Sequence, residues 1–156
     1  MRMLVLSDSH GNYPLALKAI EKAGRVDRIV HLGDGIEDAR IIEEIVGFPI
    51  IKVPGNCDLS APEPRELLTV SGGVRILATH GDAYHVKSGL TALHRRAVSQ
   101  EARVVLYGHT HIALAEEMEG ILFVNPGCLR YRWPDPSCAV VTLRPGKASA
   151  LILPVE

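Results

Sequence analysis

The stretch Leu4-Val5-Leu6-Ser7-Asp8-Ser9-His10-Gly11-Asn12 organises the rest of the chain, because an apolar strand runs directly into a loop with metal-binding side chains. Residues i and i+2 of an extended backbone point to the same face, so Asp8 and His10 can reach one ion together. An Asp-x-His pair is a weak signal by itself. It gains weight because four later strands of this sequence run into similar loops.

The bulk composition is that of an ordinary globular domain. The chain has 156 residues, of which 47% are hydrophobic and 22% are charged. This is enough to bury a substantial core, so we expect residues 1–156 to form a single domain. The formal net charge of −1 offers no basic surplus for a nucleic-acid backbone, and we expect nucleic acid to matter only as a nucleotide-type substrate.

The cysteine content and the hydropathy of the chain indicate its cellular compartment. Cys57, Cys128 and Cys138 form neither a C-x-x-C pair nor an even disulfide set, which favours a reducing compartment. No apolar segment has the length needed to cross a bilayer, and the run at 3–6 is too short for the core of a signal peptide. We therefore expect a cytoplasmic protein that is not bound to a membrane.

Apolar runs and helical patterns alternate along the first third of the chain. We expect strands at 3–6, 27–32 and 49–53, separated by helices at 14–24 and 37–46, an order typical of parallel strands. Further along, the pattern predicts a hairpin turning at Gly72-Gly73, a helix at 86–100 and strands at 103–107, 113–118, 121–124, 139–143 and 148–153. These strands are too many for one small sheet, so we expect an α/β fold with two stacked sheets and helices outside.

Metal-binding side chains follow five of the expected strands. The donors are Asp8, His10, Asp34, Asn56, His80, His109 and His111. Ligand sites of open α/β sheets lie at the carboxyl ends of the strands, so these side chains should meet at one edge. Seven donors exceed what one tetrahedral ion needs, whereas two adjacent ions can use them all. Asp34 suits the bridging position, because its two oxygens can span ions about 3.5–4 Å apart.

The chemistry of these donors narrows the choice of metal. A mixture of imidazole, carboxylate and amide groups disfavours Cu(I), iron–sulfur clusters and an all-oxygen calcium site. The same mixture suits manganese, iron, cobalt, nickel and zinc, and it does not rank them.

The ordered motifs D-x-H, G-D, G-N-x-D, H-G and G-H-T-H resemble those of the calcineurin-like metallophosphoesterases, and in particular the small phosphodiesterases of the YfcE type. The resemblance runs from Met3 to about Val141. It implies an αββα sandwich of two mixed β-sheets flanked by helices, and a pair of divalent ions of which manganese is the first to expect. It also implies that Asp8, His10, Asp34 and His111 hold one ion, and that Asp34, Asn56, His80 and His109 hold the other.

Two such ions suit the hydrolysis of a phosphate ester. A water shared between them is acidified toward a pKa of about 7, and the ions also hold the phosphate for in-line attack. No serine or cysteine nucleophile is then needed. We therefore expect a metal-dependent phosphodiesterase in which a metal-bridging hydroxide attacks phosphorus, with Asp8, Asp34, Asn56 and His80 acting in catalysis through the metals and this hydroxide.

Cys57 departs from the pattern of many superfamily members, which carry His after the Asn of G-N-x-D and use it as a general acid. A thiol with a pKa of about 8.5 is a poorer proton donor to a phosphate oxygen. We therefore expect weak activity unless the leaving group is good, and a preference for diesters over unactivated monoesters. Cys57 is also interpretable as a small packing residue beside a ligand.

Four other residues stay open between a role at the site and an ordinary one. Asp58 either orients a neighbouring ligand or caps its own turn, and His31, inside a strand, either packs or orients a ligand. His85 either touches the substrate or faces solvent. Arg130 follows Asn125-Pro126-Gly127-Cys128, which resembles the family's N-P-G-S segment, and it either meets a phosphate or belongs to an exposed basic loop.

Two alternative functions are compatible with the same fold. A non-catalytic protein-binding scaffold, as in the retromer subunit of this architecture, tends to lose metal ligands, whereas every ligand position here holds a competent donor. A broader phosphomonoesterase is disfavoured by Cys57 and by the lack of an extra lid domain. The expected partner is thus a small phosphodiester substrate. A homo-oligomer is compatible with the sequence, although no stretch marks an interface.

Overall fold

The chain forms two β-sheets that pack face to face. A computed structural model describes residues Met1–Glu156 and contains ten strands, five in each sheet. The first sheet has the order β10-β9-β1-β2-β3, and the second has the order β4-β5-β6-β8-β7. The strands are β1 (Arg2–Leu6), β2 (Arg28–His31), β3 (Ile50–Lys52), β4 (Glu66–Ser71), β5 (Val74–Thr79), β6 (Val104–Leu106), β7 (Leu114–Met118), β8 (Ile121–Asn125), β9 (Ser137–Arg144) and β10 (Lys147–Pro154).

β1 lies at the centre of the first sheet because it is apolar on both faces. Met3, Leu4, Val5 and Leu6 are all buried, and burying each such side chain contributes about 1.5–3 kcal/mol. β1 pairs in parallel with β2, and β2 with β3, which confirms the expected parallel arrangement of the first three strands. β9 and β10 return as an antiparallel pair on the other side of β1.

The second sheet begins with the expected hairpin of β4 and β5. Its turn is made by Gly72 and Gly73, whose φ values are 57° and 77°; two left-handed residues in succession are what a tight two-residue hairpin requires. β6 pairs in parallel with β5 and with β8, and β7 pairs antiparallel with β8. Both sheets are therefore mixed.

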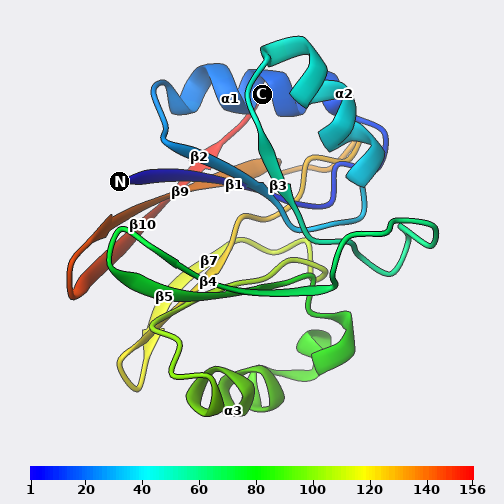
Figure 1. The fold of residues 1–156 in the computed structure, drawn as a ribbon. Coiled ribbons are helices and arrows are strands. Elements are labelled where there is room, and N and C mark those ends of the chain that lie inside the picture. The colour runs from blue at the N-terminus through cyan, green and yellow to red at the C-terminus, as the bar shows by residue number, and fades with distance from the viewer.

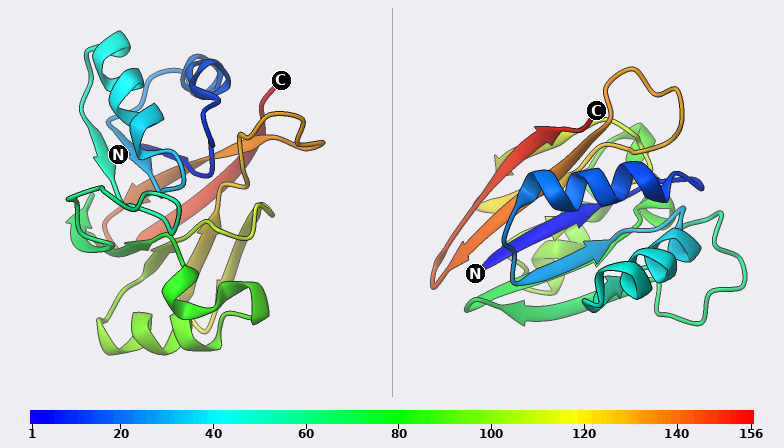
Figure 2. Two further views of the ribbon diagram at one scale, coloured as in Figure 1. Left: turned by 90° about the vertical axis from the view of Figure 1, so that its right-hand side faces the viewer. Right: turned by 90° about the horizontal axis from the view of Figure 1, so that it is seen from above.

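Three α-helices cover the outer faces of the sandwich. Figure 1 shows α1 (Tyr13–Ala23) and α2 (Ile36–Val46) against the first sheet, and α3 (Thr91–Ser99) against the second. Separate apolar clusters fill the three interfaces: one between the sheets, one beneath α1 and α2, and one beneath α3. The two views of Figure 2 agree on this layering. The expected αββα sandwich is confirmed.

The helix expected at 86–100 is wrong in its first part. Two short 3-10 turns, Asp82–Tyr84 and Val86–Ser88, come first, and α3 begins only at Thr91. The helix cannot extend back through Gly89, because this residue has φ 133° and ψ 175°, far outside the helical region. The apolar spacing of the segment gave no sign of this break.

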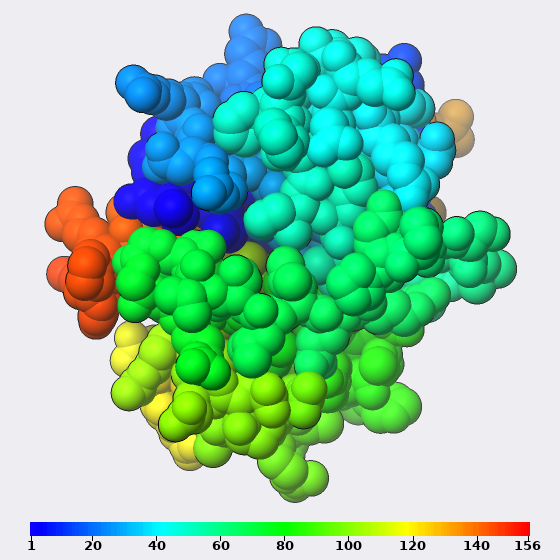
Figure 3. All heavy atoms as spheres, in the orientation of Figure 1, coloured from blue at the N-terminus to red at the C-terminus, as the bar shows by residue number.

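The loops that follow the strands gather at one end of the sandwich. β1 starts at the N-terminus on the left of Figure 1 and runs to the right, and the left panel of Figure 2 looks onto this right-hand end. In the space-filling view of Figure 3, N-terminal residues in blue and cyan cover the upper half of the molecule, and residues of the second sheet and of α3, in green and yellow, cover the lower half. The expected ligands come from both sheets, because they follow β1, β2 and β3 of the first sheet and β5 and β6 of the second.

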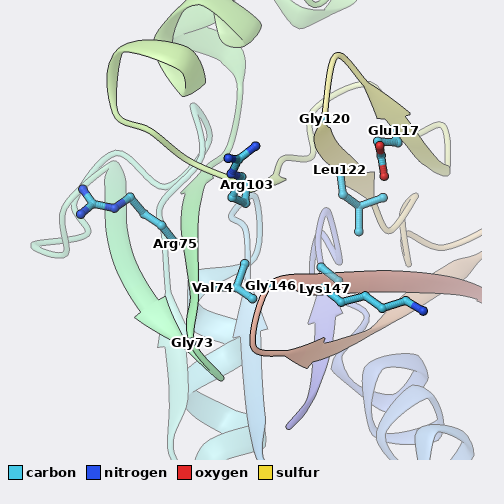
Figure 4. Close-up of a pocket in the computed structure, with 10 residues that line it drawn as sticks. Gly73, Val74, Arg75, Arg103, Glu117, Gly120, Leu122, Gly146 and Lys147 are labelled. Carbon is cyan, nitrogen blue, oxygen red and sulfur yellow. The ribbon is translucent and has the colours of Figure 1, made fainter.

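A cleft lies at the opposite end, where the strand turns are. It has a volume of about 610 Å³ and is lined by residues of three turns, among them Gly73, Gly120 and Gly146 (Figure 4). None of the seven expected metal ligands contacts it. Its cations Arg75, Arg103 and Lys147 point apart in Figure 4, so it does not form a convergent site. No helix of the chain combines the length and the apolar character needed to cross a membrane.

Candidate metal centre

Six of the seven expected ligands converge at the carboxyl ends of β1, β2, β5 and β6. Asp8, His10 and His111 form one group and Asp34, His80 and His109 another, and within each group the candidate ligand atoms lie within 4.8 Å of one another. Each loop follows a buried strand, so residues distant in sequence are held to rigid elements. A third group joins His10 and Asp34 to Cys57.

The two main groups are in contact with each other. Within the first group, His111 Nε2 lies 3.1 Å from Asp8 Oδ1. Within the second group, His80 Nε2 lies 3.4 Å from Asp34 Oδ2. His10 Nε2 and His80 Nε2 each approach both carboxylates, at 3.4–3.9 Å. His80 Nε2 is also 3.1 Å from His109 Nδ1. The carboxylates and imidazoles therefore form one continuous cluster.

This cluster fits divalent metal ions. Asp8 Oδ1 is buried and makes no hydrogen bond, although imidazole nitrogens surround it. A buried carboxylate oxygen without a hydrogen bond is costly, whereas a bound cation would satisfy it. The imidazole and carboxylate donors match the preferences of Mn²⁺, Co²⁺, Ni²⁺, Fe²⁺ and Zn²⁺.

Asn56, the seventh expected ligand, lies in the loop that follows β3. It is exposed, and its side-chain amide faces Cys57 Sγ at 3.7 Å. Its backbone is nevertheless adjacent, because the N–H of Cys57 donates to Asp34 Oδ1 at 2.8 Å.

The remaining expected site residues are placed differently from one another. Cys57 is exposed beside Asp34. Arg130 is exposed, and its charge only partly offsets the upward shift that contact with Asp8 gives to the pKa of His10. His85 is exposed between the two 3-10 turns, has a φ of 52° and makes no side-chain hydrogen bond.

The histidines of the cluster favour the ionised form of its two carboxyl groups. Burial opposes ionisation of Asp8, but contacts with His10 and His111 hold the pKa of this carboxyl well below its usual range. Burial also acts against Asp34, yet contact with His80 lowers its pKa to about 2. Both residues are therefore carboxylates at neutral pH, which is the form that binds metal.

The carboxylates in turn shift the pKa values of His10 and His80 upward, whereas the pKa of His109 is shifted downward. Contact with Asp8 raises the pKa of His10. Burial lowers the pKa of His80, but Asp34 and Asp8 outweigh it and the net shift is upward. Burial and the charge of His80 lower the pKa of His109, which favours its neutral, ligating form. Because a metal ligates the neutral form, metal binding competes with protonation of the first two imidazoles.

Five of the seven ligand positions have a left-handed backbone. The φ values are 54° for Asp8, 44° for His10, 52° for Asp34, 69° for His109 and 63° for His111. Such conformations cost about 1–3 kcal/mol for residues other than glycine and persist only where the surroundings impose them. Here the loops hold one another: Asp8 N–H donates to Gly33 O and His10 N–H to Asp34 O.

Asp58 fixes two of the loops at once. Its carboxylate accepts hydrogen bonds from the backbone N–H groups of Asp34, Gly35, Ile36 and Gly55, at 2.6–3.1 Å. The first three donors lie at the start of α2, where unpaired N–H groups favour an anion. The sequence left two roles open for Asp58, and its contacts match both: it holds the backbone of the expected ligand Asp34, and by accepting from Gly55 N–H it caps its own turn.

Several residues that support the cluster carry no specific signal in the sequence. Ser7 Oγ donates to Asp8 Oδ2 at 2.5 Å, and Asp38 accepts from Ser9 Oγ at 2.6 Å and from Gly11 N at 2.8 Å. Asp38 stood out only as an acid in the first turn of a helix. His80 Nδ1 faces Leu32 O at 2.7 Å, an arrangement that leaves Nε2 free for a metal.

Comparison with known proteins agrees with the fold and with these donors. Residues 1–146 match the family described as the calcineurin-like phosphoesterase superfamily domain. The chain belongs to this superfamily. The expected family is confirmed, and with it the assignment of the protein as a metal-dependent phosphoesterase, because the donors needed for a metal centre are present.

Individual relatives add detail. The probable metallophosphoesterase YsnB of Bacillus subtilis is 37% identical over 133 residues, which cover 83% of this chain and 76% of YsnB. Phosphodiesterase MJ0936 of Methanocaldococcus jannaschii is 29% identical over 153 residues, covering 90% of this chain and 92% of that protein. A crystal structure of Vps29 from Entamoeba histolytica in complex with Zn²⁺ aligns with a TM-score of 0.75 over 99% of both chains, at 19% identity. This last likeness concerns the fold alone.

Proposed function

We propose that this calcineurin-like phosphoesterase hydrolyses phosphodiesters at a dinuclear metal centre. The observation that carries the proposal is the contact between the two donor groups, in which His10 Nε2 and His80 Nε2 each lie within 4 Å of both carboxylates. Two ions can share such a cluster, with Asp34 as the bridge. Manganese is the first metal to test, and nickel, cobalt, iron and zinc follow.

The seven ligands would divide between the two ions. Asp8, His10, Asp34 and His111 would hold one, and Asp34, Asn56, His80 and His109 the other. When bound, such a pair of ions supplies an acidified water as nucleophile and neutralises charge on the phosphoryl oxygens. The chain's own part is to keep Asp8 and Asp34 ionised, to place the imidazoles beside these carboxylates and to hold both kinds of donor rigidly.

The preference for diesters is attributed to Cys57. Burial and the charge of Asp34 raise the pKa of its thiol, so the group stays neutral and is a poor source of a proton for a departing oxygen. A diester with a good leaving group does not need that proton. The relative MJ0936 carries the name phosphodiesterase, which supports the same choice.

The alternative is a protein-binding scaffold, as the likeness to Vps29 allows. Metal binding does not separate the two functions, since a Vps29 has been solved with Zn²⁺. The ionised, closely spaced carboxylates favour the enzyme. The three free cysteines suit the reducing cytoplasm that we propose as the location.

One assay separates the candidates. The Mn²⁺-loaded protein is offered bis-p-nitrophenyl phosphate and p-nitrophenyl phosphate, with and without chelator. A phosphodiesterase prefers the diester and stops on chelation, a broader phosphatase prefers the monoester, and a scaffold cleaves neither. Asp34→Asn should lower kcat/KM for the diester by 10²-fold or more, at about 2.7 kcal/mol of transition-state stabilisation. Asp27→Asn, an acid far from the cluster, is the matched control and should leave activity unchanged.

A further inference from the structure

The loop after β8 leads to an aromatic residue beside the metal centre. The loop is tied to the centre at its start, because Leu129 N–H donates to the backbone oxygen of Asp8 at 3.2 Å and Asn12 Nδ2 donates to Leu129 O at 2.8 Å. Leu129 is fully buried. Whatever follows it is therefore fixed relative to Asp8.

The next residues turn back over the site. Trp133 N–H donates to Arg130 O at 3.4 Å, and Arg132 inside this turn has a φ of 59°. The base of the loop is closed by Ser137 N–H, which donates to Cys128 O at 3.2 Å. The backbone of the turn is thus held at both ends.

Trp133 lies against a candidate metal ligand. Its ring is 5.3 Å from the ring of His111, at an interplanar angle of 85°. Trp133 is only partly buried, so part of the indole stays accessible next to His111. Arg130, at the other end of the turn, is exposed. An exposed cation and an accessible aromatic surface therefore lie beside the same edge of the metal cluster.

We propose that two residues of this turn select phosphodiesters that carry an aromatic ring next to the phosphate: Trp133 stacks on the ring and Arg130 attracts the anion. This rests on the proposed phosphodiesterase function and names its substrate class. Stacking of a base on an aromatic side chain is favourable whatever the base, and an arginine pairs well with phosphate oxygens. A nucleobase and a phenyl group share this chemistry.

A purely structural role for Trp133 predicts different behaviour. If Trp133 only held His111 in place, its removal would weaken metal binding and affect all ligands equally. A stacking role affects only ligands with a ring. The comparison of adenosine 5′-monophosphate with glycerol 3-phosphate separates these cases, because both carry a phosphate monoester and only one carries a ring.

The first experiment uses Trp133 as its own reporter, since it is the only tryptophan of the chain. Adenosine 5′-monophosphate should quench its fluorescence saturably in the Mn²⁺-loaded protein, whereas glycerol 3-phosphate should not. A lack of quenching by the nucleotide overturns the proposal. This readout needs no turnover, so it stays informative if the proposed phosphodiesterase activity fails.

The second experiment measures inhibition of bis-p-nitrophenyl phosphate hydrolysis by the same two compounds. Trp133→Ala should raise the inhibition constant of the nucleotide about tenfold, leave that of glycerol 3-phosphate unchanged and leave Mn²⁺ affinity unchanged. Trp133→Phe should stay within about threefold of the natural protein, since it keeps a ring. Tyr131→Ala, which removes an aromatic residue that is 60% exposed on the same turn, should have no effect.

Two results would refute the stacking role. One is an equal change for both inhibitors in Trp133→Ala, and the other is weaker Mn²⁺ binding by that variant. If the protein hydrolyses no diester at all, the proposed function fails, and the fluorescence titration alone judges the role of Trp133. If adenosine 5′-monophosphate quenches the fluorescence of Trp133 but phenyl phosphate does not, the aromatic ring that Trp133 recognises is a nucleobase.

Discussion

The Asp58 carboxylate accepts a hydrogen bond from the backbone N–H of Asp34, with 2.6 Å between Oδ2 and the nitrogen. The same oxygen accepts from Gly55 N–H at 2.8 Å. One side chain thus joins the loop that carries Asp34 to the loop that carries Asn56. The distance between these two loops, and with it the shape of the metal centre, depends on a residue that need not touch a metal.

Replacement of Asp58 by Ala should therefore weaken both the fold and the metal centre. Loss of a charged acceptor from several N–H groups is expected to lower the free energy of unfolding by about 3 kcal/mol. Mn²⁺ affinity should fall by about 10–100-fold, as for other residues that orient ligands. Urea unfolding and calorimetric Mn²⁺ titration measure the two effects.

Asp27→Ala is the control for that variant. The Asp27 carboxylate also accepts a backbone hydrogen bond, from Arg2 N at 2.7 Å, but at an exposed place away from the centre. It should lower stability slightly and leave Mn²⁺ affinity as it is. If Asp58→Ala bound Mn²⁺ as tightly as the natural protein, the role assigned to Asp58 would be wrong.

Gly55 is required for space rather than for backbone conformation. A Cβ at this position would lie 2.2 Å from Asp34 Oδ1, while the φ of Gly55 is one that any residue adopts. Gly55→Ala should push Asp34 aside, at a cost of about 1–3 kcal/mol in stability, and strongly reduce Mn²⁺ binding. In Gly24→Ala a Cβ would meet nothing within 4 Å, so this control should lose some stability through its φ of 68° and no Mn²⁺ affinity. Unchanged binding in Gly55→Ala would count against Asp34 as a ligand.

Cys57→His should raise activity on monoesters with poor leaving groups. An imidazole with a pKa of about 6.5 can donate a proton near neutral pH, and general acids contribute at least on the order of 10²-fold. The gain should be larger for phenyl phosphate than for p-nitrophenyl phosphate, whose leaving group needs little help. Cys57→Ser, similar in size but no better as an acid, is the comparison. Equal kcat/KM values for phenyl phosphate in all three proteins would refute this role.

His31 should make the metal-free protein less stable in mild acid. It is fully buried, its Nδ1 accepts Gly33 N–H at 3.2 Å and its Nε2 lies 2.9 Å from Ser9 Oγ. Burial lowers its pKa from 6.5 to about 4. Between pH 6.5 and about 4, His31 is protonated in the unfolded chain and neutral in the folded protein, so the free energy of unfolding falls as the pH drops.

The lowered pKa of His31 sets how much stability the protein loses in acid. The free energy of unfolding should decrease by about 3 kcal/mol between roughly pH 6.5 and 4 on account of His31. Urea denaturation at a series of pH values in chelator measures it. His31→Gln should show a shallower pH dependence over this range. Parallel curves for the two proteins would show that His31 does not carry the effect.

The sequence patterns predicted the layers of the fold and the loops of the centre for a clear physical reason. Apolar strands that are buried on both faces, such as β1, leave polar residues only at their ends, and parallel strands bring those ends to one edge. Side chains with metal-binding chemistry therefore had to meet there. The αββα arrangement followed from the number and spacing of strands.

Other features depend on local geometry that residue patterns do not encode. The left-handed backbone of Asp8 and His10 is imposed by hydrogen bonds to a loop more than twenty positions away. The break before α3 depends on the conformation of Gly89, and an isolated glycine is tolerated in many helices. Trp133 meets His111 only because the loop that carries it is anchored to Asp8, which no spacing rule describes.

The number of ions bound per chain, and the coupling between them, tests the dinuclear centre most directly. Metal analysis combined with electron paramagnetic resonance of the Mn²⁺-loaded protein measures both. We predict two Mn²⁺ ions per chain with the spectrum of an exchange-coupled pair, and loss of the coupling in Asp34→Asn. A single ion per chain, or two ions that show no coupling, would contradict a pair of metals bridged by Asp34.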